Sequence, residues 1–164
     1  MHIMIRKFNL LFITFFFVGK IKFAPGTVAS FITCFLFLLL INIFNFTTIF
    51  LITLAIFFYS LIAINNSFNE FNSEDPQEIV IDEVTGQMMP LLAIPIYETL
   101  YPLPNIYYFV SAFLLFRLFD IWKPYPINYI DNNIKGSLGI MLDDVFAGLY
   151  AIIILSLALF FFGG

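Results

Sequence analysis

Long runs of hydrophobic residues, separated by short polar segments, dominate this chain of 164 residues. A mainly apolar run of about 20 residues can cross a bilayer as a helix, because each helical residue adds about 1.5 Å of length. Spanning segments must be helical, since lipid cannot satisfy open backbone N–H and C=O groups. The first two runs are joined only by a short turn at residues 45–47 and form a helical hairpin. The pattern therefore predicts five spans, at residues 29–44, 48–64, 79–100, 106–122 and 138–162.

The N-terminal apolar run, residues 8–18, is shorter. Arg6 and Lys7 precede it, as in a signal peptide, but no small-residue cleavage site follows and Lys20 and Lys22 come at once. We therefore expect a retained interfacial or re-entrant segment, and a full first span is the alternative. Polar or Pro-rich loops are predicted at residues 65–77, 101–105 and 125–137.

Composition supports a membrane protein, with 62% hydrophobic and only 11% charged residues. A soluble domain of this length could not bury so many apolar side chains. The predicted fold is an all-α polytopic membrane bundle that forms a single domain over residues 1–164. A net charge of −4 argues against a nucleic-acid partner. With one cysteine, Cys34, and one histidine, His2, a disulfide, a Cys-cluster metal site and His-based catalysis are all disfavoured.

Basic residues predict the orientation of the bundle. With the N-terminus in the cytoplasm and five spans threaded, all of them fall on or near the cytoplasmic face, as the positive-inside rule requires. The same threading brings three charged segments to one membrane edge, at residues 78–83, 117–123 and 143–144. The basic residues are Arg6, Lys7, Lys20, Lys22, Arg117, Lys123 and Lys135.

Acidic residues inside hydrophobic runs are the main candidates for function. A carboxylate at the middle of a bilayer costs about 3 kcal/mol, so such groups must be paired, hydrated or bound to metal. Glu78 and Asp82 are four residues apart and would share a helical face, and Glu83 could reach the same cavity. Their hard oxygen ligands suit Mg²⁺. A solvated helix end is the alternative.

Asp143 and Asp144 form the second acidic pair, within a segment rich in small residues. Such residues allow a neighbouring helix to approach closely. Adjacent acids near the start of a helix can instead simply interact favourably with its dipole, and this alternative stays open.

Arg117, Asp120 and Lys123 recur at three-residue spacing near a helix end. In one interpretation, Arg117 and Asp120 form an internal ion pair. In the other, Asp120 binds a metal, while Arg117 and Lys123 bind phosphate oxygens, for which a guanidinium fork and an ammonium group are suited.

A possible anion site precedes the first span. Pro25 and Gly26 are expected to form a turn, and Thr27 is a good N-cap for the helix that follows. A helix N-terminus beside Lys20 and Lys22 can bind an anion. A plain cap with interfacial lysines is the alternative.

Four stretches of the chain form a recognisable series, namely FAPGTVAS at residues 23–30, EIVIDEVTGQ at 78–87, RLFDIWKPYPI at 117–127 and KGSLGIMLDDVFAG at 135–148. In this order they resemble the phosphatidylglycerophosphatase A family of bacterial membrane lipid phosphatases. The resemblance implies a Mg²⁺-dependent enzyme of the bacterial inner membrane. Such an enzyme removes the terminal phosphate of its lipid substrate, phosphatidylglycerophosphate, to give phosphatidylglycerol for phospholipid biosynthesis. Pro90, soon after Gly86, departs from the family pattern and concerns the geometry of the third span.

We expect an active site at the cytoplasmic edge. Mg²⁺, as one ion or two, would be held by a subset of the acids, which are the predicted catalytic residues, and Glu78 would support them. Either a water attacks the phosphoryl group or a phospho-aspartyl intermediate forms. The predicted catalytic and metal-binding residues are Asp82, Glu83, Asp120, Asp143 and Asp144, and the predicted phosphate-binding residues are Lys22, Thr27, Arg117, Lys123 and Lys135.

Other chemistries fit the sequence less well. A Cys-x5-Arg phosphatase would need arginine where Leu40 stands, His2 is the lone histidine, and Asp82 does not begin an Asp-x-Asp nucleophile motif. The competing class is a cation or proton transport protein with intramembrane carboxylates. Such a protein would distribute acids through the membrane, whereas here only Glu98 is expected near the opposite face.

Overall fold

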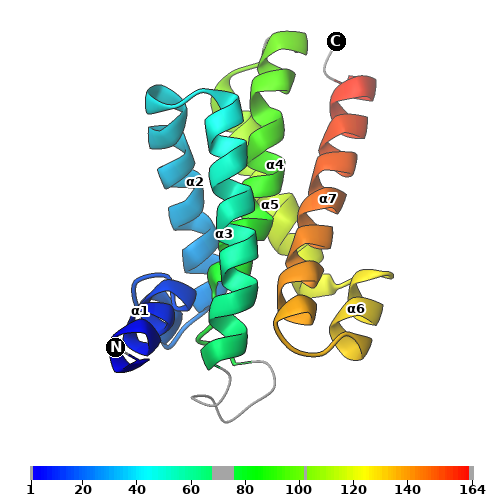
Figure 1. Ribbon diagram of the computed structural model, residues 1–164. Helices are drawn as coiled ribbons and strands as arrows, with labels where there is room; N and C mark the ends of the chain where they lie inside the picture. The colour runs from blue at the N-terminus through cyan, green and yellow to red at the C-terminus, as the bar shows by residue number, and fades with distance from the viewer. Residues whose placement is uncertain (1, 68–75, 102, 163–164) are drawn as a thin grey trace.

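The computed structural model describes residues 2–67, 76–101 and 103–162, and the elements formed by these residues are all helical (Figure 1). Two short helices and a 3-10 turn lie at the end of the bundle that is drawn lowest, here called the lower end (Figure 1). These are α1 (His2–Ile13), η1 (Val18–Lys20) and α6 (Ile127–Asn133). The long helices are α2 (Pro25–Ile43), α3 (Phe46–Ser67), α4 (Ile81–Leu100), α5 (Asn105–Trp122) and α7 (Ser137–Phe162).

The long helices match the predicted spans in number and position. Within the described part of the chain, α2, α3, α5 and α7 are long and apolar enough to cross a membrane. Helix α4 has 20 residues but carries Asp82, Glu83 and Glu98 together with two prolines. It packs against α2, α3, α5 and α7, so most of its side chains contact protein and need not be apolar. The chain is thus an all-α membrane bundle with α4 at its centre.

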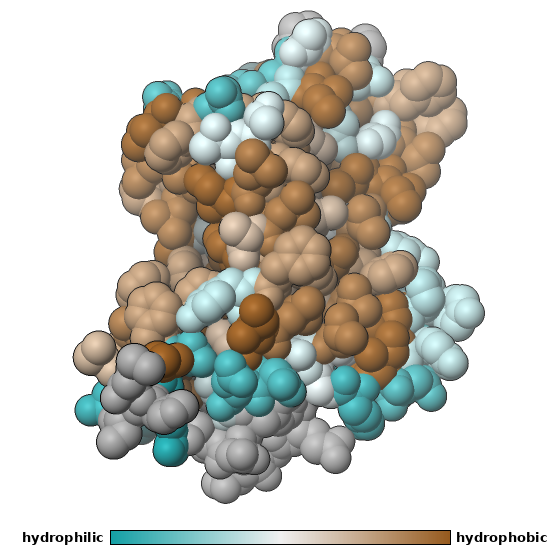
Figure 2. Space-filling view, viewed as in Figure 1, coloured by the Kyte–Doolittle hydropathy of each residue, from teal (hydrophilic) through white to brown (hydrophobic). Residues whose placement is uncertain are grey.

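Hydrophobic side chains cover the body of the molecule, and hydrophilic ones gather along its lower edge with a smaller group at the upper end (Figure 2). This distribution is expected of helices whose outer faces contact lipid and whose ends lie at the two membrane surfaces. The lower end therefore offers the larger polar surface.

The N-terminal segment does not form a full span. Helix α1 has 12 residues and so a length of about 18 Å, well short of the apolar core of a bilayer. It packs against α3, where the Tyr59 hydroxyl donates a hydrogen bond of 2.8 Å to the Asn9 side-chain oxygen. The backbone N–H of Val80 donates to the carbonyl oxygen of Ile13 at 3.0 Å. These contacts fix α1 beside the lower end, as expected for an interfacial segment.

Two local predictions are wrong. The stretch at residues 125–137 is not simply a polar loop, because it contains α6, whose Ile127 and Ile130 are buried. Residues three apart lie on the same side of a helix, so these two buried side chains hold the short helix against the bundle. The turn predicted at Pro25 and Gly26 is also absent, since both belong to the first turn of α2. Proline suits that position because its missing N–H has no partner there anyway.

Two further expectations concern helix boundaries. Thr27 is the third residue of α2 and cannot be its N-cap, because Ala24 occupies that position. Helix α4 begins at Ile81, so Glu78 precedes the helix and does not share a helical face with Asp82. Most of the loop predicted at residues 65–77 lies outside the described residues, and α3 continues through Ser67.

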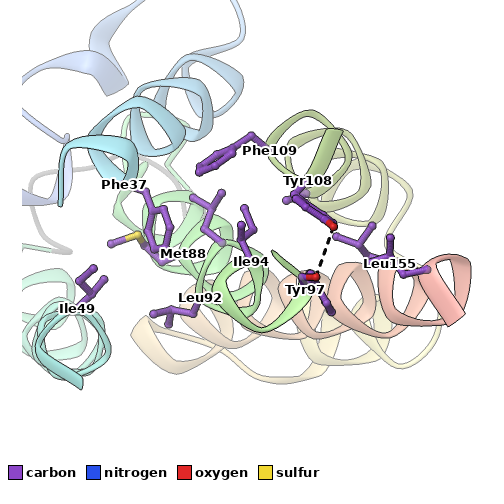
Figure 3. Packing of buried hydrophobic residues seen from close by; sticks show 12 residues of the cluster. Phe37, Ile49, Met88, Leu92, Ile94, Tyr97, Tyr108, Phe109 and Leu155 are labelled. Carbon is purple, nitrogen blue, oxygen red and sulfur yellow. Dashed lines mark hydrogen bonds between the residues drawn. The ribbon is translucent and has the colours of Figure 1, made fainter. Parts of the chain in front are cut away.

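A hydrophobic cluster joins the long helices in the upper part of the bundle (Figure 3). The Tyr97 and Tyr108 rings stack with their centroids 6.2 Å apart. The Tyr108 hydroxyl donates to the backbone oxygens of Tyr97, at 3.4 Å, and Tyr101. The Tyr97 hydroxyl in turn lies 2.7 Å from that of Ser156 on α7. This cluster fixes the long helices relative to one another in the upper part of the bundle.

Helices α4 and α7 cross with their backbones in close approach. A Cβ atom at Gly148 would lie 2.5 Å from the carbonyl oxygen of Gly86, and one at Gly86 would lie 2.6 Å from that of Asp144. Neither backbone can move without shifting a whole helix. The small residues at this crossing therefore set the distance between the two helices that carry most of the acids.

We expect Gly148→Ala to destabilise the protein by about 1–3 kcal/mol, the usual cost of overpacking, although alanine is the better helix former. Unfolding by sodium dodecyl sulfate in mixed micelles, followed by circular dichroism, measures the change. Ala158→Val is the control, because Ala158 lies on an exposed face of the same helix. A stability of Gly148→Ala equal to or above wild type would contradict the close crossing.

Candidate functional site

Charged side chains from distant parts of the chain line one cavity of about 490 Å³ at the lower end. Asp82 and Glu83 come from the first turn of α4, Asp120 from the last turn of α5, and Asp143 and Asp144 from the second turn of α7. The predicted phosphate-binding residues also line this cavity, namely Lys22, Thr27, Arg117, Lys123 and Lys135. The sequence predicted only that these residues share one membrane edge. The structure shows that they line one cavity.

Three of the acids are close enough to share one cation. One carboxylate oxygen from each of Asp82, Glu83 and Asp144 lies within 4.8 Å of the other two. Asp144 is buried, and the Glu83 Oε2 atom has no hydrogen-bond partner among the described residues. Oxygen ligands of this kind, with an unpartnered buried oxygen among them, suit a hard divalent cation such as Mg²⁺.

Helix dipoles explain only part of the acidic cluster. Asp82 and Glu83 lie in the first turn of α4, where a negative charge interacts favourably with the dipole. Asp143 and Asp144 follow six residues of α7, and the dipole effect has largely fallen off by then. The hydrogen bond between them is local: the backbone N–H of Asp144 donates to Oδ1 of the adjacent Asp143 at 3.1 Å. The second pair therefore needs compensation from side chains or from a bound cation.

Arg117 lies close to one of the three acids that can share an ion. Its guanidinium forms an ion pair with Asp120, one turn further along α5, and its Nη1 atom lies 4.0 Å from Glu83 Oε1. Its Nε atom is buried without a hydrogen-bond partner in the described part of the chain. The internal ion pair considered from the sequence is present, and the same pair lines the cavity where a phosphate group could enter.

Lys123 joins α5 to both α6 and α7. Its backbone has φ of 47° at the end of α5, and its ammonium group donates to Asp131 Oδ1 at 2.7 Å and to Asp143 Oδ2 at 2.8 Å. Burial lowers the pKa of Lys123, but the bonds to Asp131 and Asp143 outweigh this, so the pKa lies above its ordinary value. Lys123 is therefore charged at neutral pH and holds Asp143 in place.

Asp131 is a site residue that the sequence analysis missed. It lies in the stretch predicted to be a polar loop, and it reaches the cavity because α6 folds back beside α7. Nothing in its neighbourhood along the chain signals this role. An ion pair between Lys123 and Asp131 depends on the tertiary position of α6.

The N-terminus of α2 closes another side of the cavity. A Cβ atom at Gly26 would lie 1.8 Å from Glu83 Oε1, so only glycine lets the helix end approach this carboxylate so closely. The first N–H groups of a helix have no intrahelical partner and carry partial positive charge. Thr27 and Lys22 line the cavity beside them. This end of α2 is suited to an anion.

Glu78 was predicted to support the metal-binding acids. Among the described residues, it is not part of the lining of the carboxylate cavity, and it lies instead in an adjoining groove with Lys20 and Lys22. The reason is that α4 begins only at Ile81, which leaves Glu78 in the preceding turn.

Family comparison agrees with the motifs at this cavity. The model of the family described as phosphatidylglycerophosphatase A matches residues 11–159. This chain belongs to the phosphatidylglycerophosphatase A family. It is accordingly an enzyme of the phosphatase class. No solved structure matches the chain.

Curated relatives of this phosphatase cover most or part of its length. A Haemophilus influenzae phosphatidylglycerophosphatase A is 33% identical over 136 residues, which are 83% of this chain and 79% of the relative. The Escherichia coli K12 phosphatidylglycerophosphatase A is 41% identical over 75 residues, 45% of this chain and 39% of the relative. A Bacteroides thetaiotaomicron protein, provisionally named a phosphatidylinositol-3-phosphatase, is 36% identical over 143 residues, 85% of this chain and 86% of the relative.

We expect Gly26→Ala to lower phosphatase activity by about 100-fold, the effect of misplacing a catalytic group by about 1 Å. The new methyl group would displace the flexible end of Glu83, so the fold should survive. Phosphate release from a phospholipid phosphomonoester and the thermal unfolding midpoint measure the two effects. Val28→Ala, in the same helical turn but outside the cavity lining, is the control. Wild-type activity of Gly26→Ala would show that the Glu83 position is not needed.

Proposed function

We propose that this chain is a Mg²⁺-dependent phosphatase that removes the terminal phosphate of phosphatidylglycerophosphate and releases phosphatidylglycerol. The observation that carries the proposal is the cavity at the lower end, where six acids line the same space as Arg117 and the N-terminus of α2. A metal-binding acidic surface opposite anion-binding groups is what hydrolysis of a phosphate ester requires.

The substrate assignment is supported by the family and by two relatives. The proteins of Haemophilus influenzae and Escherichia coli are both named for action on phosphatidylglycerophosphate. The Bacteroides thetaiotaomicron relative is named for action on a phosphorylated phosphatidylinositol. Both kinds of lipid carry a phosphomonoester on the headgroup, and we propose the first because the family model agrees with it.

Mg²⁺ would be held by Asp82, Glu83 and Asp144, whose oxygen atoms lie closest together. Asp120 and Asp143 line the same cavity and complete the set of acids that the sequence predicts to bind metal. When bound, Mg²⁺ would neutralise charge on the phosphoryl oxygens and lower the pKa of a bound water.

The remaining groups would bind and orient the phosphate. Arg117 and the first N–H groups of α2 lie on the cavity wall and would donate hydrogen bonds to phosphoryl oxygens, with Lys22 and Lys135 supplying further positive charge. Lys123 acts mainly through Asp143, which it holds in place. A carboxylate beside the phosphorus would orient the attacking water or act as the nucleophile itself. If water attacks, the ester P–O bond breaks, inorganic phosphate leaves, and a proton from the water passes to the glycerol oxygen. If a carboxylate attacks, the ester P–O bond breaks, the glycerol oxygen takes a proton from solvent, and water then hydrolyses the aspartyl phosphate to inorganic phosphate and the free carboxylate.

We place the lower end in the cytoplasmic leaflet of the bacterial inner membrane. Each of the seven basic residues belongs to a segment at or near that end, as the positive-inside rule predicts for a cytoplasmic face. A substrate could then enter from the leaflet with its acyl chains still in the bilayer.

The transport hypothesis has less support. A path for ions would need polar groups through the whole depth of the bundle. The upper part instead holds the hydrophobic cluster shown in Figure 3. Of the three acids among the described residues of α4, Glu98 alone lies outside the cavity lining. Membership of a phosphatase family also favours an enzyme.

We expect Asp82→Asn, which changes a proposed metal ligand, to reduce phosphate release from phosphatidylglycerophosphate by about 100-fold or more. Asp143→Asn, which changes a carboxylate supporting the metal ligands, should reduce it by about 10- to 100-fold. Purified protein in detergent micelles with Mg²⁺ provides the assay, and circular dichroism verifies the fold. Glu98→Gln is the matched control, because it removes a carboxylate from the opposite end of α4. Near wild-type rates in both aspartate variants would reject the site.

A further inference from the structure

A second, more open groove adjoins the carboxylate cavity. Lys20, Lys22 and Glu78 supply its charged groups, and Gly19 forms part of its wall. Lys22, Pro25 and Gln77 line both the groove and the cavity, so the two spaces share one boundary. A ligand can therefore occupy both at once.

The wall of this groove is closely packed. A Cβ atom at Gly19 would lie 1.9 Å from the backbone oxygen of Glu78, which places the two segments in direct contact. The Gly19 N–H donates to the Thr14 backbone oxygen at 2.9 Å. The two lysines that follow are consequently held beside the start of α2.

Exposed hydrophobic side chains surround the lysines. Phe16 and Phe23 are 70% and 85% exposed, and Phe17 is 55% exposed. The Lys20 ammonium lies 5.1 Å from the centre of the Phe17 ring. Exposed aromatic rings next to lysines are typical of segments that lie among lipid headgroups. The groove therefore opens at the level where the phosphates of the leaflet are found.

We propose that this groove binds the phosphodiester of the lipid substrate while the carboxylate cavity holds its distal phosphomonoester. The inference rests on the proposed function and adds a substrate class, namely phospholipids with a phosphodiester and a second phosphate further out on the headgroup. Phosphatidylglycerophosphate has this arrangement, and so does a phosphorylated phosphatidylinositol. The diester stays attached to the diacylglycerol, so it must lie at the membrane surface, where Lys20 is found.

Charge in the groove matches a diester. Two lysines and the Glu78 carboxylate leave one net positive charge, which suits the single negative charge of a phosphodiester. A phosphomonoester carries nearly two negative charges and is better compensated by a divalent cation with Arg117. The groove would thus bind the phosphodiester, and the carboxylate cavity the phosphomonoester, of one headgroup.

Two inhibitors of phosphatidylglycerophosphate hydrolysis test the proposal. A short-chain phosphatidylglycerol carries the diester alone, and inorganic phosphate probes the carboxylate cavity alone. We expect Lys20→Ala to weaken inhibition by the short-chain phosphatidylglycerol about tenfold, the effect of losing one charge-assisted hydrogen bond. Inhibition by inorganic phosphate should be unaffected, because Lys20 does not line the carboxylate cavity. Lys22→Ala should weaken both inhibitors, since Lys22 lines both spaces.

Lys7→Ala is the control for a general loss of surface charge, because Lys7 is an exposed lysine of α1 outside both spaces. Equal weakening of both inhibitors in Lys20→Ala, no weakening of either, or the same change in Lys7→Ala would overturn the inference. So would an absence of inhibition of the wild-type enzyme by the short-chain phosphatidylglycerol. Failure of the wild-type enzyme to hydrolyse phosphatidylglycerophosphate would instead refute the proposed function.

Discussion

Mutual repulsion of carboxylates in a site shielded from water is the constraint on which the lower end of this bundle depends. Two like charges about 4 Å apart repel by about 4 kcal/mol at an effective dielectric constant of about 20. A typical folding free energy of about 5–15 kcal/mol could not tolerate several such pairs without compensation. The fold nevertheless gathers six acids around one cavity. Arg117 and Lys123 offset part of this charge through their ion pairs, and the remainder favours a divalent cation.

The rest of the structure positions these groups. Helix α4 lies at the centre and α7 crosses it at Gly86 and Gly148, which brings Asp82 and Glu83 close to Asp144. One hydrophobic cluster holds the long helices in the upper part, and two further clusters pack the helices around the lower end. The short helices α1 and α6 then flank the lower end, and α6 adds Asp131, which holds Lys123.

Much of this arrangement is predictable from the sequence, because lipid imposes a strong pattern. The hydrophobic runs predicted the long helices to within a few residues, and threading them alternately placed Asp82, Asp120 and Asp143 at one edge. What failed depended on contacts between segments. The role of Asp131 requires α6 to fold back beside α7, and the position of Glu78 depends on where α4 begins. Neither is encoded in local spacing or in the hydrophobic pattern.

Binding of Mn²⁺, which accepts the same oxygen ligands as Mg²⁺, tests the central claim most directly. Electron paramagnetic resonance of the purified protein in lipid nanodiscs would count bound ions. We expect wild-type protein to bind Mn²⁺ and Mg²⁺ to displace it. We expect Glu83→Gln and Asp144→Asn each to abolish most of the binding while the fold is retained. Undiminished binding in both variants, or no binding by the wild-type protein, would contradict the central claim.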